Sequence, residues 1–334
     1  MLISKEMDLR TKVNIEVSPF KISYNKGVMF IGSCFASSIG EQMEMGRMPV
    51  MINPAGAVFN PVSVCNTIDN IISGKTFVKE DLYFYNNTWL SFSHYTDFSS
   101  DDPDIVLEKI NKKAVESFTF LRNASFLFIT LGTARIYKLK ETGETVSNCH
   151  KLPTGYFERE LLTVDYTAKL FSDQLDRLQS LFLQLKVVFT ISPVRHWKDG
   201  AHGNQVSKSV LFLAVEELLD HSFSPGYFPA YELLMDDLRD YRFYDEDMLH
   251  PSDVAEKYIW EAFSGSYLDK EALNIYSEVT KITKACKHRF NSDSVSKKRE
   301  FAERMQKQIS EIEAKVPTID FSNEKKYFQN LISF

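Results

Sequence analysis

Cysteine and long apolar runs are both scarce in this sequence. Its 334 residues contain four cysteines, which stand far apart and form no C-x-x-C pair. They are Cys34, Cys65, Cys149 and Cys286. Unpaired cysteines argue against a disulfide framework or a cysteine-ligated zinc site, and they fit a reducing compartment. No run approaches the roughly 20 apolar residues that span a bilayer, and the first residues lack the apolar core of a signal peptide. We therefore expect a cytoplasmic protein with no membrane partner.

An excess of positive charge is also absent. The formal net charge is −6 at pH 7, and no basic face dominates the sequence. Because nucleic-acid-binding domains carry a basic patch or stripe, we expect no nucleic-acid partner. The contents of 44% hydrophobic and 25% charged residues are those of a soluble globular protein. The length allows one large domain, or one domain with an appendage.

Three apolar runs predict the buried strands of a sheet. They are 27–32, 126–130 and 187–191, and each is of the continuous type that is buried on both faces. Helical segments alternate with them at 37–45, 62–72, 166–183 and 207–219, and 50–52 is a further short strand. This alternation predicts a parallel sheet that is covered by helices on both faces. Residues 230–234 fit either a strand or the end of a helix.

Two β-hairpins are predicted to interrupt the alternation. Residues 82–92 turn at Asn86-Asn87, and residues 134–146 turn near Thr142-Gly143. We expect both insertions near the candidate site, where they would shape its rim. Residues 1–24 alternate loosely and fit either an edge strand or an arm.

The C-terminal part of the chain is predicted to be helical. A helix at 255–263 should pack on the sheet, and the charged stretch from 270 to 315 is helical as well. Met305, Ile309 and Ile312 recur at helical spacing and predict a packing face, either within the chain or against a partner subunit. We therefore divide the chain into a domain at 1–265 and a helical extension at 266–334, through which the protein could form a homo-oligomer.

The segment Gly32-Ser33-Cys34-Phe35-Ala36 directly follows the first predicted strand. Glycine permits a tight turn, and the end of such a strand aims the next side chains into the crevice where open α/β sheets bind ligands. Ser33 and Cys34 are therefore candidate nucleophiles. The alternative is that Cys34 is a small buried hydrophobic residue.

Asp247 and His250 stand three residues apart near the other end of the same domain, just before Pro251. A carboxylate and an imidazole at this spacing can serve one nucleophile from a single loop. The same pair also occurs at helix N-termini and in surface ion pairs. Together, the early nucleophile turn and the late Asp-x-x-His pair predict one catalytic site.

The segment after the first strand and the Asp247/His250 pair are two of several motifs in which the chain resembles the family that is named after its GSCFA motif. This family is related to the SGNH/GDSL hydrolases. The resemblance runs in family order over about residues 25–265. Besides Phe30 to Ala36 and the Asp247/His250 pair, it is carried by Asn53-Pro54-Ala55-Gly56, Leu131-Gly132-Thr133-Ala134, Asn148-Cys149-His150-Lys151, Ser192-Pro193-Val194-Arg195-His196, Lys198-Asp199-Gly200-Ala201-His202 and Tyr241-Arg242-Phe243-Tyr244. It implies an α/β, three-layer α/β/α fold of the flavodoxin-like, SGNH type, with a five-stranded doubly wound parallel sheet.

The resemblance also implies a Cys/Ser-His-Asp triad. His250 matches the general base of the superfamily, and Asp247 matches the residue that orients this base. Laid on the Gly-Asp-Ser-Leu pattern of the superfamily, Cys34 falls on the nucleophilic serine and Ser33 on the aspartate. A thiolate is a strong nucleophile, and an adjacent imidazolium lowers the pKa of a thiol. Cys34 is therefore the first candidate, and Ser33 is the competing one.

The predicted oxyanion hole departs from the superfamily pattern. Gly56 matches the glycine after the second strand, but Gly132-Thr133-Ala134-Arg135 stands where Gly-x-Asn-Asp is expected. Thr133, Asn148 or Asn53 could supply the missing donor. Asn53 is also a candidate substrate ligand, and a turn cap is its alternative role.

Polar residues follow the predicted strand at 187–191. The candidate substrate ligands among them are Arg195, His196, His202 and Asn204. They could bind a carboxylate, a phosphate or sugar hydroxyls. A metal-assisted phosphodiesterase site on His196, Asp199 and His202 is an alternative, but their spacing matches no strong metal signature, and we expect no metal.

The resemblance and these residues together predict an esterase or acyltransferase that works through a covalent acyl-enzyme. The expected substrate is a small molecule or a carbohydrate, such as an acylated sugar or an envelope precursor. We expect no cofactor, apart from an acyl-CoA donor if the enzyme is a transferase. The alternative is a catalytically inactive protein that keeps the SGNH fold and binds a small molecule or glycan.

Overall fold

The computed structural model describes residues 10–286 and 295–332. Their core is a parallel sheet with the strand order β10-β9-β5-β1-β2. The five strands are β1 (Gly27–Gly32), β2 (Val50–Ile52), β5 (Ala124–Leu131), β9 (Lys186–Ile191) and β10 (Gly226–Tyr227). Counted in chain order within this sheet, the arrangement is 2-1-3-4-5, which is the flavodoxin-like order. The predicted three-layer α/β/α fold is therefore confirmed.

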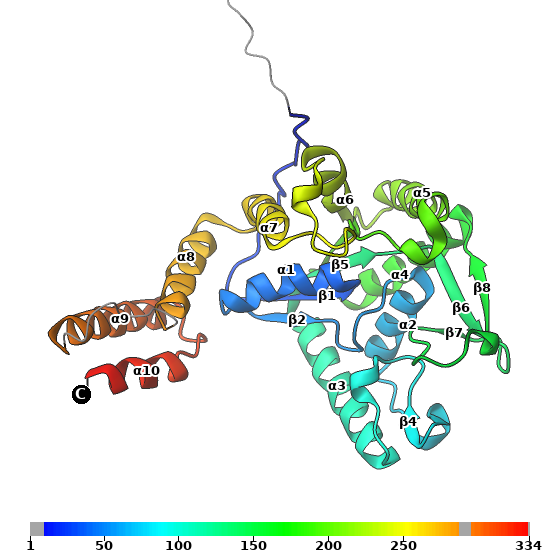
Figure 1. The fold of residues 1–334 in the computed structure, drawn as a ribbon, viewed down its shortest axis with the longest axis horizontal. Helices are drawn as coiled ribbons and strands as arrows, with labels where there is room; N and C mark the ends of the chain where they lie inside the picture. The colour runs from blue at the N-terminus through cyan, green and yellow to red at the C-terminus, as the bar shows by residue number, and fades with distance from the viewer. Residues whose placement is uncertain (1–9, 287–294, 333–334) are drawn as a thin grey trace, which may run out of the picture.

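Helices cover both faces of this sheet, as Figure 1 shows. The first face carries α1 (Cys34–Met45) and α7 (Asp253–Tyr267), and the second carries α2 (Pro61–Ile72), α4 (Val164–Leu181) and α5 (Gly200–Leu219). Successive side chains of a strand point to opposite faces. Phe30 of β1 accordingly joins the core under α1 and α7, whereas its neighbours Met29 and Ile31 join the core under α2, α4 and α5.

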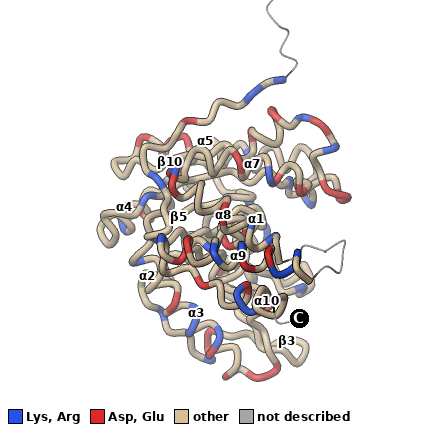
Figure 2. Tube along the Cα trace, turned by 90° about the vertical axis from the view of Figure 1, so that its left-hand side faces the viewer, with Lys and Arg blue, Asp and Glu red and all other residues tan. Residues whose placement is uncertain are grey.

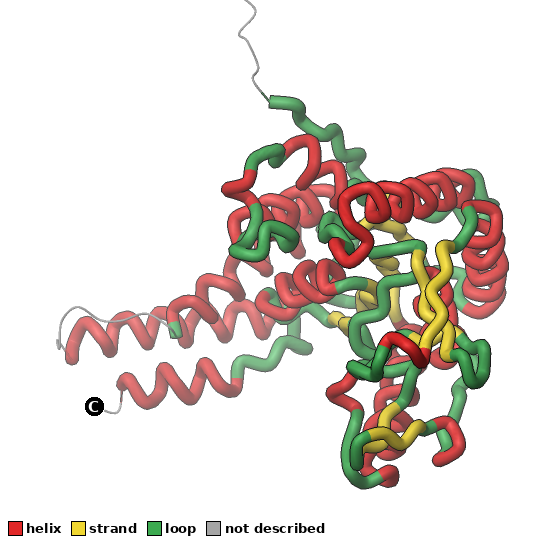
Figure 3. The backbone as a smooth tube through the Cα atoms, turned by 45° about the vertical axis from the view of Figure 1, so that its right-hand side comes forward, coloured by secondary structure: helices red, strands yellow, loops and turns green. Residues whose placement is uncertain are grey.

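Both predicted hairpins are present (Figure 3). β3 (Tyr83–Tyr85) and β4 (Thr88–Leu90) are joined by Asn86 and Asn87, whose φ angles are 48° and 57°. Asparagine tolerates these left-handed values, which a two-residue hairpin turn requires. In the second insertion, β6 (Arg135–Leu139) pairs with both β7 (Thr145–Val146) and β8 (Phe157–Leu161). The third strand, β8, is not predicted by the sequence because its middle residues are charged and exposed.

Two helices begin earlier than the sequence predicts. α1 begins at Cys34 and not at Ser37, and α5 begins at Gly200 and not at Ser207. Residues with weak helix propensity lie in both first turns and conceal these starts: Cys34 and Ser37 in α1, and Gly200 and Gly203 in α5. The earlier start of α1 matters for the site because it places Cys34 in the first turn of this helix.

Other departures from the prediction also have local causes. α3 (Pro103–Asn123) is a long helix that buries only a narrow stripe, so its sequence lacks a broad apolar signal. Residues 230–234 are helical, in α6 (Ala230–Glu232) and the π-helical turn Leu233–Asp237, and the fifth strand is the preceding β10. A two-residue strand is too short to give a periodic pattern.

The C-terminal helices form an arm that extends from the body (Figures 1 and 3). They are α8 (Lys270–Ala285), α9 (Val295–Lys315) and α10 (Ser322–Ile332). The predicted stripe of Met305, Ile309 and Ile312 is buried within the chain, since α9 packs against α8 and α10. Arg47, just after α1, pairs with Glu324 of α10 and ties the arm to the body. The domain boundary at 265/266 and the homo-oligomer stay predictions.

The segment before β1 contacts the start of this arm. Residues 1–9 of the predicted edge strand or arm lie outside the described part, but Ile22 forms a parallel bridge with Leu268. Figure 2 shows Lys and Arg interspersed with Asp and Glu along the trace. Within the described ranges, no helix combines the length and the apolar character that a bilayer span requires.

Candidate active site

Gly32 ends β1 in a position that only glycine fits. Its φ is 157°, and a Cβ there would lie 2.4 Å from the carbonyl oxygen of Thr130 on β5. Asn53, from the loop after β2, holds the turn from the other side: its Oδ1 accepts a hydrogen bond from the Gly32 N–H at 2.8 Å. Its Nδ2 donates to Ser37 Oγ at 2.9 Å. The Asn53 amide is thus engaged in holding the turn that presents the candidate nucleophiles.

Ser33 and Cys34 differ sharply in accessibility. Ser33 is 5% exposed, and its hydroxyl is buried with no hydrogen-bond partner. Cys34 is exposed and occupies the first turn of α1. Burial of the thiol raises its pKa, and the Phe35 and Cys34 backbone N–H groups oppose this rise because they lie beside the sulfur. Cys34 is therefore the nucleophile candidate that a substrate can reach, and its thiol is protonated at neutral pH unless a base removes the proton.

Asp247 and His250 form a preassembled pair on the loop that leads into α7. Asp247 Oδ2 lies 2.6 Å from His250 Nδ1, and its Oδ1 accepts hydrogen bonds from the backbone N–H groups of Leu249 and His250. The backbone and the ring of His250 hold the pKa of Asp247 at about 2. Because Nδ1 is engaged by the carboxylate, Nε2 is the nitrogen that can accept a proton from a nucleophile.

Glu256, in the first turns of α7, lies within electrostatic reach of both halves of the site. Burial raises the pKa of Glu256, and the charge of His250 partly offsets this rise. The Glu256 charge adds to the burial that raises the pKa of Cys34. α7 also packs against α1. The charge of this carboxylate therefore acts on both the early turn and the late loop.

Lys208 of α5 lies behind the nucleophile turn, in a position that the sequence analysis does not predict. The residue is 1% exposed, and its Nζ donates a hydrogen bond of 2.6 Å to the carbonyl oxygen of Ser192. The Tyr231 ring lies 5.8 Å from the same nitrogen. Burial lowers the pKa of Lys208 to about 7, with Cys34 opposing the shift and Arg195 adding to it. In its protonated form, Lys208 therefore interacts favourably with the thiolate of Cys34.

Replacing Lys208 by methionine should flatten the pH dependence of stability. The folded pKa of about 7 lies below the unfolded value of 10.5, so between these values the unfolded chain binds the extra proton and stability rises with pH. From pH 7 to pH 9 this group alone should add about 2 kcal/mol to the free energy of unfolding. Urea denaturation at both pH values would measure the gain. If the free energy of unfolding of Lys208→Met rose equally from pH 7 to pH 9, Lys208 would not be the source of this pH dependence.

Two of the predicted oxyanion donors, Gly56 and Thr133, are already engaged in this structure. The Gly56 N–H donates to the Asn53 carbonyl at 2.7 Å, and the Thr133 N–H donates to the Phe59 carbonyl at 3.2 Å. The Thr133 hydroxyl lies 2.8 Å from Ser207 Oγ. Asn148 lines a pocket, and its Oδ1 accepts from the backbone N–H two residues later. Their oxyanion role stays a prediction.

The start of α1 offers other oxyanion donors. The backbone N–H groups of Cys34 and Phe35 lie in its first turn, where N–H groups have no partner within the helix. The positive end of the helix dipole points the same way.

A cluster of charges surrounds Asp199, whose side chain is 2% exposed. Arg159 and Arg135, from the second insertion, both pair with its Oδ1, and Arg135 Nε lies 3.5 Å away. His196 Nδ1 lies 3.4 Å from Oδ2. Arg135, Arg159 and His196 border a pocket of about 170 Å³ that also includes Thr133. The sequence does not predict the Arg159 contact, because the pattern of strand β8 is charged and exposed, whereas Arg135 lies on β6 of the predicted hairpin.

The remaining predicted substrate ligands, Asn204 and His202, lie in different environments. Asn204 is fully buried, and its Oδ1 accepts a hydrogen bond from the His196 N–H at 2.9 Å. His202 is exposed on α5. Across residues 10–286 and 295–332, no three His, Cys, Asp or Glu side chains are placed to hold a metal ion. Asp199 is bound by arginines, so the phosphodiesterase alternative has no supporting geometry among these residues.

A groove of about 540 Å³ opens beside the Asp247/His250 pair, which is within the volume range of small-molecule sites. We call it the aromatic groove. Trp197, Tyr241 and Tyr244 form its walls, and Trp197 and Tyr241 are 50% and 77% exposed. Its other lining residues are Arg195, Met235, Arg239, Asp240, Asp247, Met248 and Leu249. Arg195 is the predicted substrate ligand that lines this groove together with Asp247.

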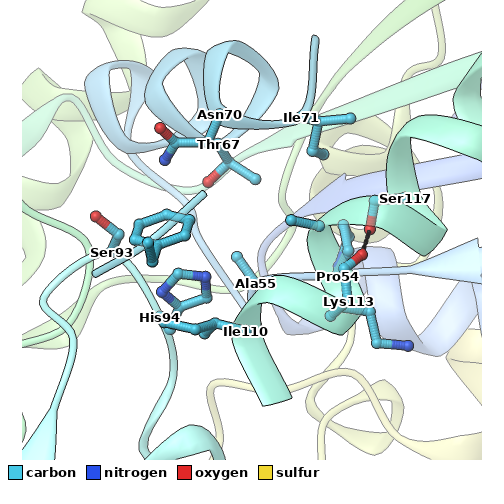
Figure 4. Close-up of a pocket in the computed structure, with 12 residues that line it drawn as sticks. Pro54, Ala55, Thr67, Asn70, Ile71, Ser93, His94, Ile110, Lys113 and Ser117 are labelled. Carbon is cyan, nitrogen blue, oxygen red and sulfur yellow. Dashed lines mark hydrogen bonds between the residues drawn. The ribbon is translucent and has the colours of Figure 1, made fainter. Parts of the chain in front are cut away.

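A second cavity, between α2 and α3, is too small for a substrate (Figure 4). Its volume of about 20 Å³ accommodates one water molecule. The His94 side chain borders it and lies 2.8 Å from Ser91 Oγ. Burial lowers the pKa of His94 to about 4, so this histidine is neutral and part of the core.

Comparison with known proteins locates two family matches. The GSCFA family matches residues 27–263, and the "GSCFA domain protein, C-terminal domain" matches residues 279–333. Among solved structures, the chain is similar to one described as a "putative GDSL-like lipase" from Parabacteroides merdae, with 11% identity and a TM-score of 0.38. That similarity covers 78% of this chain and all of the other. No curated protein matches the chain.

Proposed function

The chain belongs to the GSCFA family, and we propose that it transfers acyl groups from esters through a thioester on Cys34. The observation that carries the proposal is the preformed Asp247–His250 pair, and Glu256 interacts electrostatically with both His250 and Cys34. An exposed thiol and an oriented imidazole are the two parts that nucleophilic acyl transfer requires.

The reaction follows from these atoms. His250 Nε2 takes the thiol proton, and the sulfur of Cys34 attacks the ester carbonyl. The carbon–oxygen bond then breaks, and the imidazolium returns the proton to the leaving alcohol. A water or an acceptor alcohol, deprotonated by the same nitrogen, next attacks the thioester and restores the thiol. Water gives an esterase, and a sugar or amine acceptor gives an acyltransferase.

The first turn of α1 supports the anion that forms in each step. The N–H groups of Cys34 and Phe35 are unpaired within the helix and lie beside the sulfur. The protonated form of Lys208 also interacts favourably with a negative charge at Cys34. These donors take the place of the asparagine that the superfamily pattern contains and this chain lacks.

Treating the protein with para-nitrophenyl butyrate should leave a butyryl group on Cys34. Peptide mass spectrometry would locate it, and neutral hydroxylamine would release it because thioesters react faster than oxygen esters. The adduct should persist in Ser33→Ala and disappear in Cys34→Ala. A hydroxylamine-resistant adduct on Ser33 would instead make the hydroxyl the nucleophile. Absence of any adduct, with the ligand-binding groove intact, would favour the inactive binding protein.

A further inference from the structure

Arg195 projects into the aromatic groove without an acidic partner. Its Nη2 lies 3.5 Å from Met235 Sδ, which is a weak acceptor. Within the described ranges, no carboxylate lies at ion-pair distance from Arg195. The residue is nevertheless only partly exposed, so its guanidinium has lost part of its hydration. A half-buried cation that the protein leaves unpaired is a natural site for a ligand anion.

The other charges that line the groove are already neutralised. Arg239 pairs with Asp236 at 3.1 Å, and Asp240 pairs with Arg242 at 2.9 Å. Asp247 is engaged by His250 and two backbone N–H groups. The remaining unpaired charge of the lining is therefore the positive charge of Arg195, and Lys208, whose pKa responds to Arg195, adds to it from below.

We propose that Arg195 binds an anionic group of the substrate, so that the enzyme acts on esters whose acyl or alcohol part carries a carboxylate or a similar anion. The inference rests on the proposed function and specifies its substrate class. The planar guanidinium can donate two parallel hydrogen bonds to such a group. The rings of Trp197 and Tyr241 cover the adjoining apolar part of the substrate, and Asp247 in the same lining places the ester beside the catalytic pair.

Two matched ester pairs would test this specificity. Mono-para-nitrophenyl glutarate and para-nitrophenyl pentanoate differ by a carboxylate at the end of the acyl chain. Para-acetoxybenzoate and para-tolyl acetate differ by a carboxylate on the alcohol. We expect wild type to prefer the anionic member of one pair by at least about ten-fold in kcat/KM, as a charge-assisted hydrogen bond implies. The pair that shows the preference identifies which part of the substrate Arg195 binds.

Variants of Arg195 and Arg239 test which residue causes the preference for the anionic ester. Arg195→Met should reduce the ratio of anionic to neutral kcat/KM at least about ten-fold, mainly through KM, and Arg195→Lys should restore part of it. Arg239→Met removes the same charge from the same groove and should leave the ratio within about two-fold, because Asp236 already neutralises Arg239. An equal preference in Arg195→Met and wild type, or no preference in either ester pair, would overturn the inference.

A ligand-binding measurement tests the anion site at Arg195 independently of the proposed acyl transfer. Trp197 lines the groove, so its fluorescence can report occupancy without turnover. Glutarate should change the emission of wild type, butyramide should not, and Arg195→Met should lose the response. If glutarate binds while no adduct forms on Cys34, the proposed reaction fails and the anion site stands. If the adduct forms but glutarate does not bind and neither ester preference exists, the anion site fails alone.

Discussion

Replacing His250 by alanine should slow acylation of Cys34 by about 10²- to 10⁴-fold, the range of general-base catalysis. The thiol has a raised pKa because it is partly buried, and Glu256 adds to the rise. Without an acceptor for its proton, the sulfur is therefore a thiol at neutral pH and not a thiolate. Stopped-flow release of para-nitrophenol, followed at several pH values, would measure the acylation rate.

The shape of the pH profile makes this prediction specific. In His250→Ala the rate should rise steadily with pH as the thiol ionises by itself, whereas the rate of wild type should depend less steeply on pH because a base removes the thiol proton. Asp247→Asn should lower the rate as well, since the amide can no longer fix the tautomer of His250.

His221→Ala is the matched control. His221 follows α5, its Nε2 lies 3.4 Å from Asp176 of α4, and its loss should leave the rate unchanged. An unaltered acylation rate in His250→Ala would remove His250 from the mechanism.

Replacing Gly32 by alanine should lower the free energy of unfolding by about 2–5 kcal/mol. The new Cβ would lie 2.4 Å from Thr130 O and 2.6 Å from Thr130 Cβ, and the φ of 157° is one that L-residues rarely adopt. The clashing atoms belong to the neighbouring central strand, which is packed on both faces and cannot move aside cheaply. Urea denaturation would give the change.

Gly155→Ala provides the comparison for this substitution. A Cβ at Gly155 meets no atom within 4 Å, so its effect should stay within about 0.5 kcal/mol. Gly32→Ala should also displace the nucleophile turn, because the Gly32 N–H bonds to Asn53. A Gly32→Ala protein as stable as wild type would show that β1 and β5 can separate at this point.

The central sheet could be predicted from sequence because its strands are continuous apolar runs. β1, β5 and β9 are buried on both faces, and such runs are distinctive even without an alignment. β8 could not be predicted, since its middle residues Glu158, Arg159 and Glu160 are exposed and charged. Its pairing with β6 follows from the three-dimensional arrangement of the insertion and not from its own pattern.

The site was predictable to the extent that its chemistry is local in sequence. The Asp247–His250 contact arises within one turn, and the structure places it as the spacing predicts. Lys208 and Glu256 depend on tertiary packing, which brings α5 and α7 to the start of α1. One signal was available for Lys208: it lies on the stripe of α5 that is otherwise buried, four residues after Asn204.

Cys34 and His250 lie far apart in the sequence. This separation has a consequence for the synthesis of the protein on the ribosome. Cys34 leaves the ribosome roughly 200 residues before His250, which is a delay of about 10–40 s at ordinary elongation rates. During this interval the nascent chain carries a thiol but no base. Under the proposed mechanism, acyl transfer can therefore begin only after the last strand and α7 have emerged and docked. The order of the chain itself delays the activity until the fold that controls it is complete.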